Sequence, residues 1–175
     1  MNKIINSANE KNRQLTREAI CEALYILLNE EKDINNIKIV NLVKKAGVSR
    51  SAFYRNYNSI EDVLKSSINS NINNIIKSFN NNLSNNWKVI IQYFKNNKNH
   101  FITLYKSGYF YLLLDQFNEQ VENDNYYLLG WNGFIYNILL KWVKNDMKES
   151  DKELHSIIIE CTKKMATVIN DNKIY

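Results

Sequence analysis

Side chains suited to binding an anionic surface gather in one short stretch, KKAGVSRSAFYRNY, which runs from Lys44 to Tyr57. Arg50 and Arg55 can each donate two parallel hydrogen bonds, to guanine O6 and N7 or to phosphate oxygens. Ser49, Ser51 and Ala52 are small, so a helix built from this stretch could bring its backbone close to a surface. These residue types indicate recognition of nucleic acid.

The sequence offers little for catalysis or for metal binding. Its two histidines, His100 and His155, are far apart in the chain. There is no glycine-rich loop, no metal-ligand spacing and no Ser/His/Asp order. Cys21 and Cys161 are distant from each other and are best interpreted as reduced thiols. We therefore expect no enzyme activity, no cofactor and no metal.

Positive charge is concentrated in the first third of the chain. The whole chain carries 23 Lys and Arg against 18 Asp and Glu, a net charge of +5. Residues 1–60 hold ten of the basic and six of the acidic residues, so four of the five surplus charges lie there. This predicts an anion-binding N-terminal module on a nearly neutral body.

The elements that must position the basic stretch are predicted to be helices. The 175 residues include no proline and only four glycines, too few for the turns of a β-rich fold. Apolar residues at helical spacing predict one helix from Thr16, as its N-cap, and a second over residues 38–46. Gly47 can end the second helix in the left-handed conformation, and Ser49 can cap a third helix over residues 50–57.

Only one side of that third helix can face a partner. Phe53 and Tyr57 are four residues apart and should pack inward, whereas Ser51 and Arg55 fall on the opposite side. An ordinary helical corner with a polar exterior explains the same pattern and remains an alternative. The candidate DNA-binding residues are Lys38, Lys44, Ser49, Arg50, Ser51, Ala52, Tyr54, Arg55 and Asn56.

Further helices are predicted for the rest of the chain. Ser59, with Asp62 three residues later, should cap a long helix reaching about residue 80. Five more follow, over residues 86–96, 100–106, 109–121, 124–147 and about 151–170, the last capped by Ser150 and Glu153. The expected fold is all-α, with a helix-turn-helix domain over residues 15–60 and a regulatory and dimerisation domain over residues 61–175.

Residues 15–65 resemble the DNA-binding domain of TetR-family transcriptional regulators. The motif is Ala46-Gly47-Val48-Ser49-Arg50-Ser51-Ala52-Phe53-Tyr54-Arg55-Asn56-Tyr57, followed by Ser59-x-Glu61-Asp62-x-Leu64. The resemblance implies that Arg50, Ser51, Ala52 and Arg55 face bases. It also implies that Tyr54, Asn56 and Lys38 hold phosphates.

Three positions depart from the family pattern. Lys38 stands where the family usually opens the second helix with Thr or Ser, Ile60 stands where it has a phosphate-binding Lys, and Asn56 often replaces a His. Lys38 can restore one phosphate contact, whereas Ile60 removes one. We expect weaker or more salt-sensitive binding, not its loss.

The segment from Gly133 to Leu154 is similar to the C-terminal subfamily that includes dihydroxyacetone-kinase operon regulators. This resemblance implies a homodimer formed by the two C-terminal helices. Two short recognition helices in a two-fold dimer would reach major grooves about one helical turn apart, so the expected partner is a palindromic double-stranded DNA operator.

Aromatic residues in the body suggest a site for a small apolar or aromatic effector, although plain core packing explains them equally well. The candidate lining is Trp87, Tyr105, Tyr109, Phe110, Tyr127, Trp131 and Phe134.

A helical adaptor or co-activator that acts through a protein partner is the alternative function, since some members of the related subfamily are suspected of working in this way. The sequence shows no secretory signal and no apolar run of about 20 residues. We therefore expect a cytoplasmic protein with no membrane partner.

Overall fold

The computed structural model describes residues 2–121 and 125–170, and these residues are helical with no strand. The prediction of an all-α chain is therefore confirmed for the described residues. The helices are α1 (Asn2–Glu31), α2 (Ile39–Ala46), α3 (Arg50–Tyr54), α4 (Ile60–Lys77), α5 (Leu83–Asn96), α6 (Lys98–Lys106), α7 (Leu112–Glu119), α8 (Tyr126–Lys144) and α9 (Asp151–Asn170), with a 3-10 turn, η1 (Ile34–Asn36), before α2.

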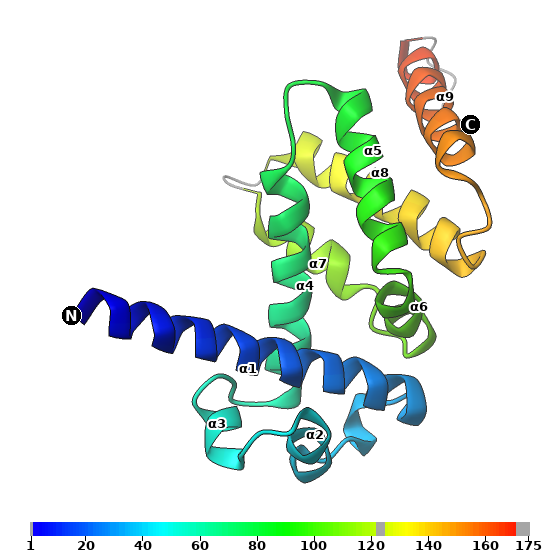
Figure 1. The fold of residues 1–175 in the computed structure, drawn as a ribbon. Coiled ribbons are helices and arrows are strands. Elements are labelled where there is room, and N and C mark those ends of the chain that lie inside the picture. The colour runs from blue at the N-terminus through cyan, green and yellow to red at the C-terminus, as the bar shows by residue number, and fades with distance from the viewer. Residues whose placement is uncertain (1, 122–124, 171–175) are drawn as a thin grey trace.

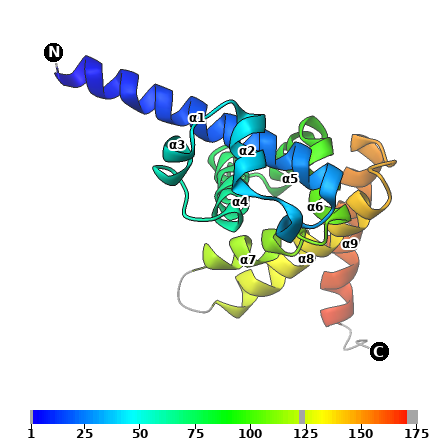
Figure 2. The ribbon, with the colours of Figure 1, turned by 90° about the horizontal axis from the view of Figure 1, so that it is seen from below.

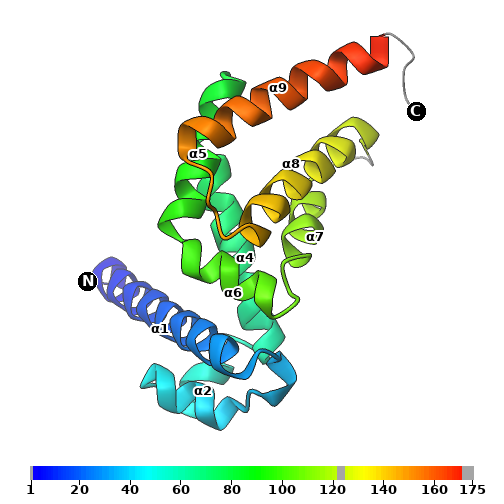
Figure 3. The same cartoon turned by 90° about the vertical axis from the view of Figure 1, so that its right-hand side faces the viewer.

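The helices form a small end piece and a larger body. Figure 1 shows α1, α2 and α3 together at one end, with α4 rising from them into the body. Helix α1 packs against α2, α4 and α6, so it touches both parts. Figure 3 shows α9 turning away from α8, and it packs mainly against α5.

One continuous apolar core joins these parts. In the end piece it contains Leu24, Leu42 and Phe53, all fully buried. Helix α4 continues it with Ile68 and Ile72 on one face, as the helical spacing predicts. In the body, the Phe94 and Phe101 rings stack with their centroids 3.7 Å apart. Burial of this apolar area is the main force that holds the end piece on the body.

Local capping signals determine where most helices start. The Ser59 hydroxyl accepts from the Asp62 amide while the Asp62 carboxylate accepts from the Ser59 amide, a complete capping box for α4. At α9, the Ser150 amide donates to the Glu153 carboxylate (2.8 Å) and the Glu153 amide donates to the Ser150 hydroxyl (3.3 Å). Both predicted capping boxes are confirmed.

The predicted start of the first helix is wrong. Helix α1 begins at Asn2, and Thr16 lies inside it, where its hydroxyl donates to the Asn12 carbonyl at 2.9 Å. A threonine can satisfy its hydroxyl in this way within a helix, and no glycine or proline upstream stops the helix. The predicted domain boundary at residue 15 therefore falls in the middle of α1.

Four predicted helix ends, those of α3, α4, α7 and α8, are also too late by two or three residues. Helix α3 ends at Tyr54 instead of Tyr57, and the chain turns so that Tyr57 becomes buried. Helix α8 ends at Lys144, because Asp146 and Met147 take positive φ angles of 59° and 53°. None of the helices within residues 2–121 and 125–170 combines the length and the apolar character needed to cross a bilayer.

Replacement of Gly47 by alanine should destabilise the protein by about 1–2 kcal/mol, because Gly47 has φ 66° and an L-residue is strained there. A methyl group at Gly47 meets no atom within 4 Å, so the strain is purely conformational. Urea unfolding measures the change.

Gly130→Ala in α8 is the matched control. Its added methyl group also meets open space, but its backbone is helical, so this change should stabilise the protein by about 0.5–1 kcal/mol. An unchanged or increased stability for Gly47→Ala would contradict the account of the turn.

Candidate nucleic-acid interface

Helices α2 and α3 meet at a tight corner. Gly47 takes the left-handed conformation, with φ 66° and ψ 29°, and its amide donates to the Lys44 carbonyl at 3.2 Å. The next amide, of Val48, donates back to the Val43 carbonyl at 3.0 Å. These bonds satisfy carbonyls at the end of α2 and turn the chain sharply into α3. The predicted role of Gly47 is confirmed.

The start of α3 is capped as predicted. The Ser49 hydroxyl accepts a hydrogen bond from the Ala52 amide at 3.1 Å. It also lies 3.0 Å from the Ser51 hydroxyl. This cap matters more here than in a long helix, since α3 spans only five residues and has few internal hydrogen bonds of its own.

Phe53 and Tyr57 fix which side of α3 faces outward. Phe53 is fully buried and Tyr57 nearly so. The Arg17 guanidinium lies 5.3 Å from the centre of the Tyr57 ring, and Arg17 also donates to the Ser66 hydroxyl at 2.7 Å. Arg17 of α1 thus contacts both the turn after α3, through Tyr57, and α4, through Ser66.

The opposite side of α3 is exposed and positively charged. Arg50, Ser51, Tyr54 and Arg55 are all exposed, and Ala52 lies at the edge of this surface, half-buried. Neither arginine forms an ion pair with a side chain in the described part of the chain. An exposed unpaired guanidinium keeps its donors available for a partner.

The remaining basic residues of the corner differ in availability. Lys38 and Lys44 are exposed, and like Arg50 and Arg55 neither is ion-paired to a described side chain. Lys45, in contrast, pairs with Glu30 of α1 at 2.8 Å. The nine predicted residues lie on α2, on α3 or in the turns beside them, with Lys38 at the start of α2 and the others at its end or beyond it.

Asn56 has local partners that the sequence did not indicate. Its amide nitrogen donates to the Ala52 carbonyl at 2.8 Å, and its amide oxygen accepts from Nε of Arg13 at 3.3 Å. Arg13 itself was missed, because the first helix was predicted to begin after it. Its spacing of four residues from Arg17 is the signal that could have revealed it, had the helix been continued upstream.

The predicted aromatic lining does not form one group. Trp87, Trp131 and Phe134 pack on one another, with ring centroids 5.1 to 6.2 Å apart. Phe110 packs instead against Tyr136, and the Tyr109 hydroxyl donates to Asp33. Tyr105 is half-buried on α6, whereas Tyr127 is 92% exposed at the start of α8. A cavity of about 580 Å³ between α1 and α6 is lined by none of these seven residues.

Burial favours the protonated, neutral forms of the Cys21 thiol and the Tyr25 hydroxyl, because it raises the pKa of each group. Burial raises the pKa of the Cys21 thiol, and a thiol that stays protonated is a poor nucleophile. Burial also raises the pKa of Tyr25, whose ring stacks on His100. No cluster of three or more His, Cys, Asp or Glu side chains with metal-binding geometry occurs among the described residues.

Comparison with known proteins does not assign this chain to a family. No protein-family model and no curated protein matches the chain. The function must therefore be argued from the residues of this chain and their arrangement.

Replacement of Ser49 by alanine should remove the cap of α3 at a cost of about 1 kcal/mol. The most direct measurement is hydrogen exchange of the Ala52 amide, which should become faster because Ser49 is its acceptor. Ser51→Ala is the control, since the only partner of the Ser51 hydroxyl in the described chain is Ser49. Equal exchange rates in the two variants would contradict the capping role.

Proposed function

We propose that this protein is a sequence-specific DNA-binding transcriptional regulator that uses α3 as its recognition helix. The observation that carries the proposal is the pair Arg50 and Arg55, exposed and without ion pairs to the described side chains, on a capped helix whose inner face is held by Phe53. A short helix after a glycine turn suits the major groove, and arginine can distinguish guanine there. The motif similar to the TetR family supports the same function.

The proposal includes a homodimer. A five-residue helix reads only a few base pairs, so two copies related by a two-fold axis are needed for a longer site. We assign the contact to α8 and α9, where Leu128 and Ile157 are exposed. The corresponding operator is a palindrome with half-sites about 34 Å apart. The protein is a cytoplasmic repressor without catalytic activity in this proposal.

Release from DNA by a small apolar or aromatic effector completes the proposal. Its support is the cluster of Trp87, Trp131 and Phe134, in which the buried indole N–H of Trp87 has no partner in the described chain. A ligand with an acceptor group could satisfy that donor. To act as an effector, it must bind one spacing of the recognition helices more tightly than the other.

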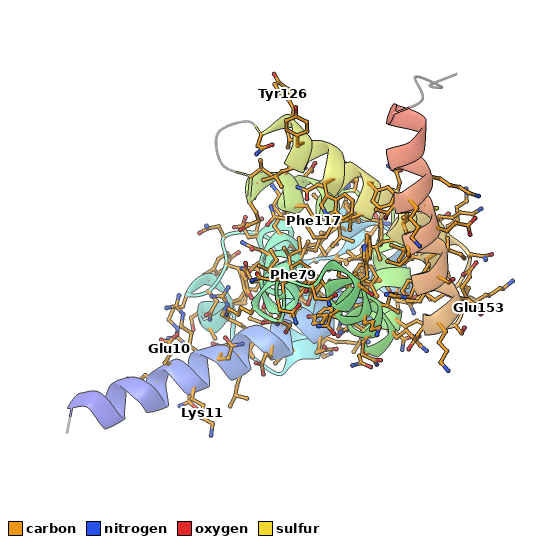
Figure 4. All side chains as sticks on the ribbon, turned by 90° about the horizontal axis from the view of Figure 1, so that it is seen from above. Glu10, Lys11, Phe79, Phe117, Tyr126 and Glu153 are labelled. Atoms are coloured by element: carbon orange, nitrogen blue, oxygen red, sulfur yellow. The ribbon has the colours of Figure 1, made fainter. Side chains whose placement is uncertain are left out.

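A protein adaptor is the second candidate, and one surface favours it. Tyr126 and Tyr127 are 84% and 92% exposed, and Leu128 beside them is also exposed. Figure 4 shows Tyr126 at the far end of the body from α3. Large exposed apolar residues that lie together mark interaction surfaces. Salt dependence separates the candidates, because DNA binding weakens steeply with salt and an apolar protein interface does not.

A mobility shift with increasing salt, on the DNA that flanks the gene of this protein, tests the proposal. Arg50→Ala and Arg55→Ala should each weaken binding to the preferred site by about 1–3 kcal/mol, roughly 5- to 150-fold, and reduce the preference over other sequences. Tyr54→Phe should weaken binding to all sequences alike, because its hydroxyl is suited to phosphate oxygens.

Lys141→Ala is a control variant, since Lys141 is an exposed cation of α8 in the body. It should leave the DNA affinity unchanged. No shift at low salt, on this DNA or on genomic fragments, would contradict DNA binding and favour the adaptor. Equal losses for Lys141→Ala and Arg55→Ala would show that charge alone matters.

A further inference from the structure

The first half of α1 extends beyond the helices that it packs against. Helix α1 is 30 residues long, and Figures 1 and 2 both show its N-terminal part projecting past α3. Every side chain from Asn9 to Leu15 is exposed. Short helices without packing are marginally stable in water, so this arm gains from a partner.

A cleft of about 530 Å³ lies between this arm and α3. Two guanidinium groups, three side-chain amides and one hydroxyl surround it, together with the methyl group of Ala52. The lining residues are Asn9, Asn12, Arg13 and Thr16 of α1 with Ala52, Arg55 and Asn56 of α3 and the turn after it. The lining contains two positive charges and no carboxylate, which is the donor set that an anion requires.

Two larger or similar cavities of the structure are lined by carboxylates as well as by cations. The cavity of about 580 Å³ between α1 and α6 includes Glu22, Glu30 and Asp146. One of about 440 Å³ between α1 and α4 includes Glu18 and Glu22. The carboxylates that line these two cavities would repel an anion.

A smaller cavity, of about 240 Å³ between α5 and α6, also has no carboxylate in its lining. Its two lysines are nevertheless neutralised, because Lys95 pairs with Asp151 at 2.7 Å and Lys98 pairs with Asp146 at 3.5 Å. Arg13 and Arg55 have no such carboxylate partner in the described part of the chain. The cleft beside α3 therefore combines positive charge with available donors.

Asn56 holds Arg13 at this cleft. It accepts the Nε hydrogen bond of Arg13 and donates to the Ala52 carbonyl, so it links the arm to α3. A guanidinium has five N–H donors, and the contact with Asn56 uses one of them. A side chain already held in place loses less entropy when it binds.

We propose that this cleft binds a phosphodiester of the DNA backbone, next to the groove that α3 enters. Arg13 is the phosphate-binding residue, and Asn56 is a positioning residue that acts through it. Arg55 belongs both to the cleft and to the exposed face of α3, so the cleft borders the surface that faces the bases. This inference rests on the proposed DNA-binding function and adds the N-terminal arm to it.

Fluorescence anisotropy over a series of NaCl concentrations tests the role of Arg13. The probes are a duplex that the wild-type protein prefers and an unrelated duplex of equal length. Arg13→Ala should weaken both complexes about tenfold at low salt and lower the slope of log K against log salt by about 1. Arg13→Lys should keep the slope, because the charge remains.

Lys11→Ala is the matched control, because Lys11 is an exposed cation on the same arm and does not line the cleft. Figure 4 shows Lys11 on the projecting part of α1. Its effect should be much smaller than that of Arg13→Ala. Equal effects of the two variants, or no effect of Arg13→Ala, would overturn the cleft assignment while leaving DNA binding by α3 intact.

A double-mutant cycle tests the role of Asn56. Asn56→Ala should weaken DNA binding in the wild-type protein but cause no further loss in the Arg13→Ala background, because Asn56 acts through Arg13. A full additional loss in that background would overturn the positioning role and show that Asn56 binds phosphate itself.

Titration with sodium phosphate alone distinguishes DNA from a small free anion as the ligand of the cleft. The NMR signal of the Arg13 Nε–H group should move only at high phosphate concentrations, because one free anion lacks the rest of the duplex. Tight saturation by phosphate, with DNA affinity unaffected by Arg13→Ala, would assign the cleft to a small anion and overturn the proposal. Failure of the wild-type protein to bind any duplex would instead contradict the proposed function.

Discussion

The burial of Phe53 is the interaction on which the candidate interface depends. Helix α3 has five residues and cannot hold its orientation by its own hydrogen bonds. A fully buried ring at its centre fixes the helix against the core and determines that Arg50 and Arg55 face outward. Gly47 and Ser49 make that burial feasible, since one turns the chain toward the core and the other starts the helix at the right residue.

Helix α1 connects this interface with the rest of the molecule. Its C-terminal half, which contains buried residues, packs against α2, α4 and α6. The Tyr25 ring stacks on His100 of α6, with ring centroids 4.1 Å apart, and Glu22 lies 3.3 Å from the same histidine. Helix α1 thus contacts both α6 of the body and α2 of the end piece. This gives a physical route by which the body could change the position of α3.

Local signals made much of the fold predictable. Gly47, Ser49 and the Ser59–Asp62 pair act within four residues, so their roles follow from the sequence. The inward direction of Phe53 follows from helical spacing in the same way, whereas Tyr57 is buried by the turn that follows α3. The start of α1 was predicted wrongly because threonine is a favoured N-cap, whereas Thr16 lies inside the helix and bonds its hydroxyl to the Asn12 carbonyl.

Contacts between distant segments could not be predicted. The link between Arg13 and Asn56 joins residues 43 positions apart, and no local pattern encodes it. The aromatic residues of the body show the same limit, because helical spacing does not distinguish a ring packed on its neighbours, such as Trp131, from an exposed ring, such as Tyr127. These contacts depend on how α1 lies beside the turn after α3 and how α5 lies beside α8.

Selection of binding sites from random double-stranded DNA tests the central claim most directly. The wild-type protein should enrich an inverted repeat whose half-sites are about one helical turn apart, with guanines at the positions that arginine reads. The Arg50→Ala/Arg55→Ala double variant should enrich no such repeat. A wild-type protein that enriches no motif, or a double variant that enriches the same motif, would contradict the assignment of α3 as a recognition helix.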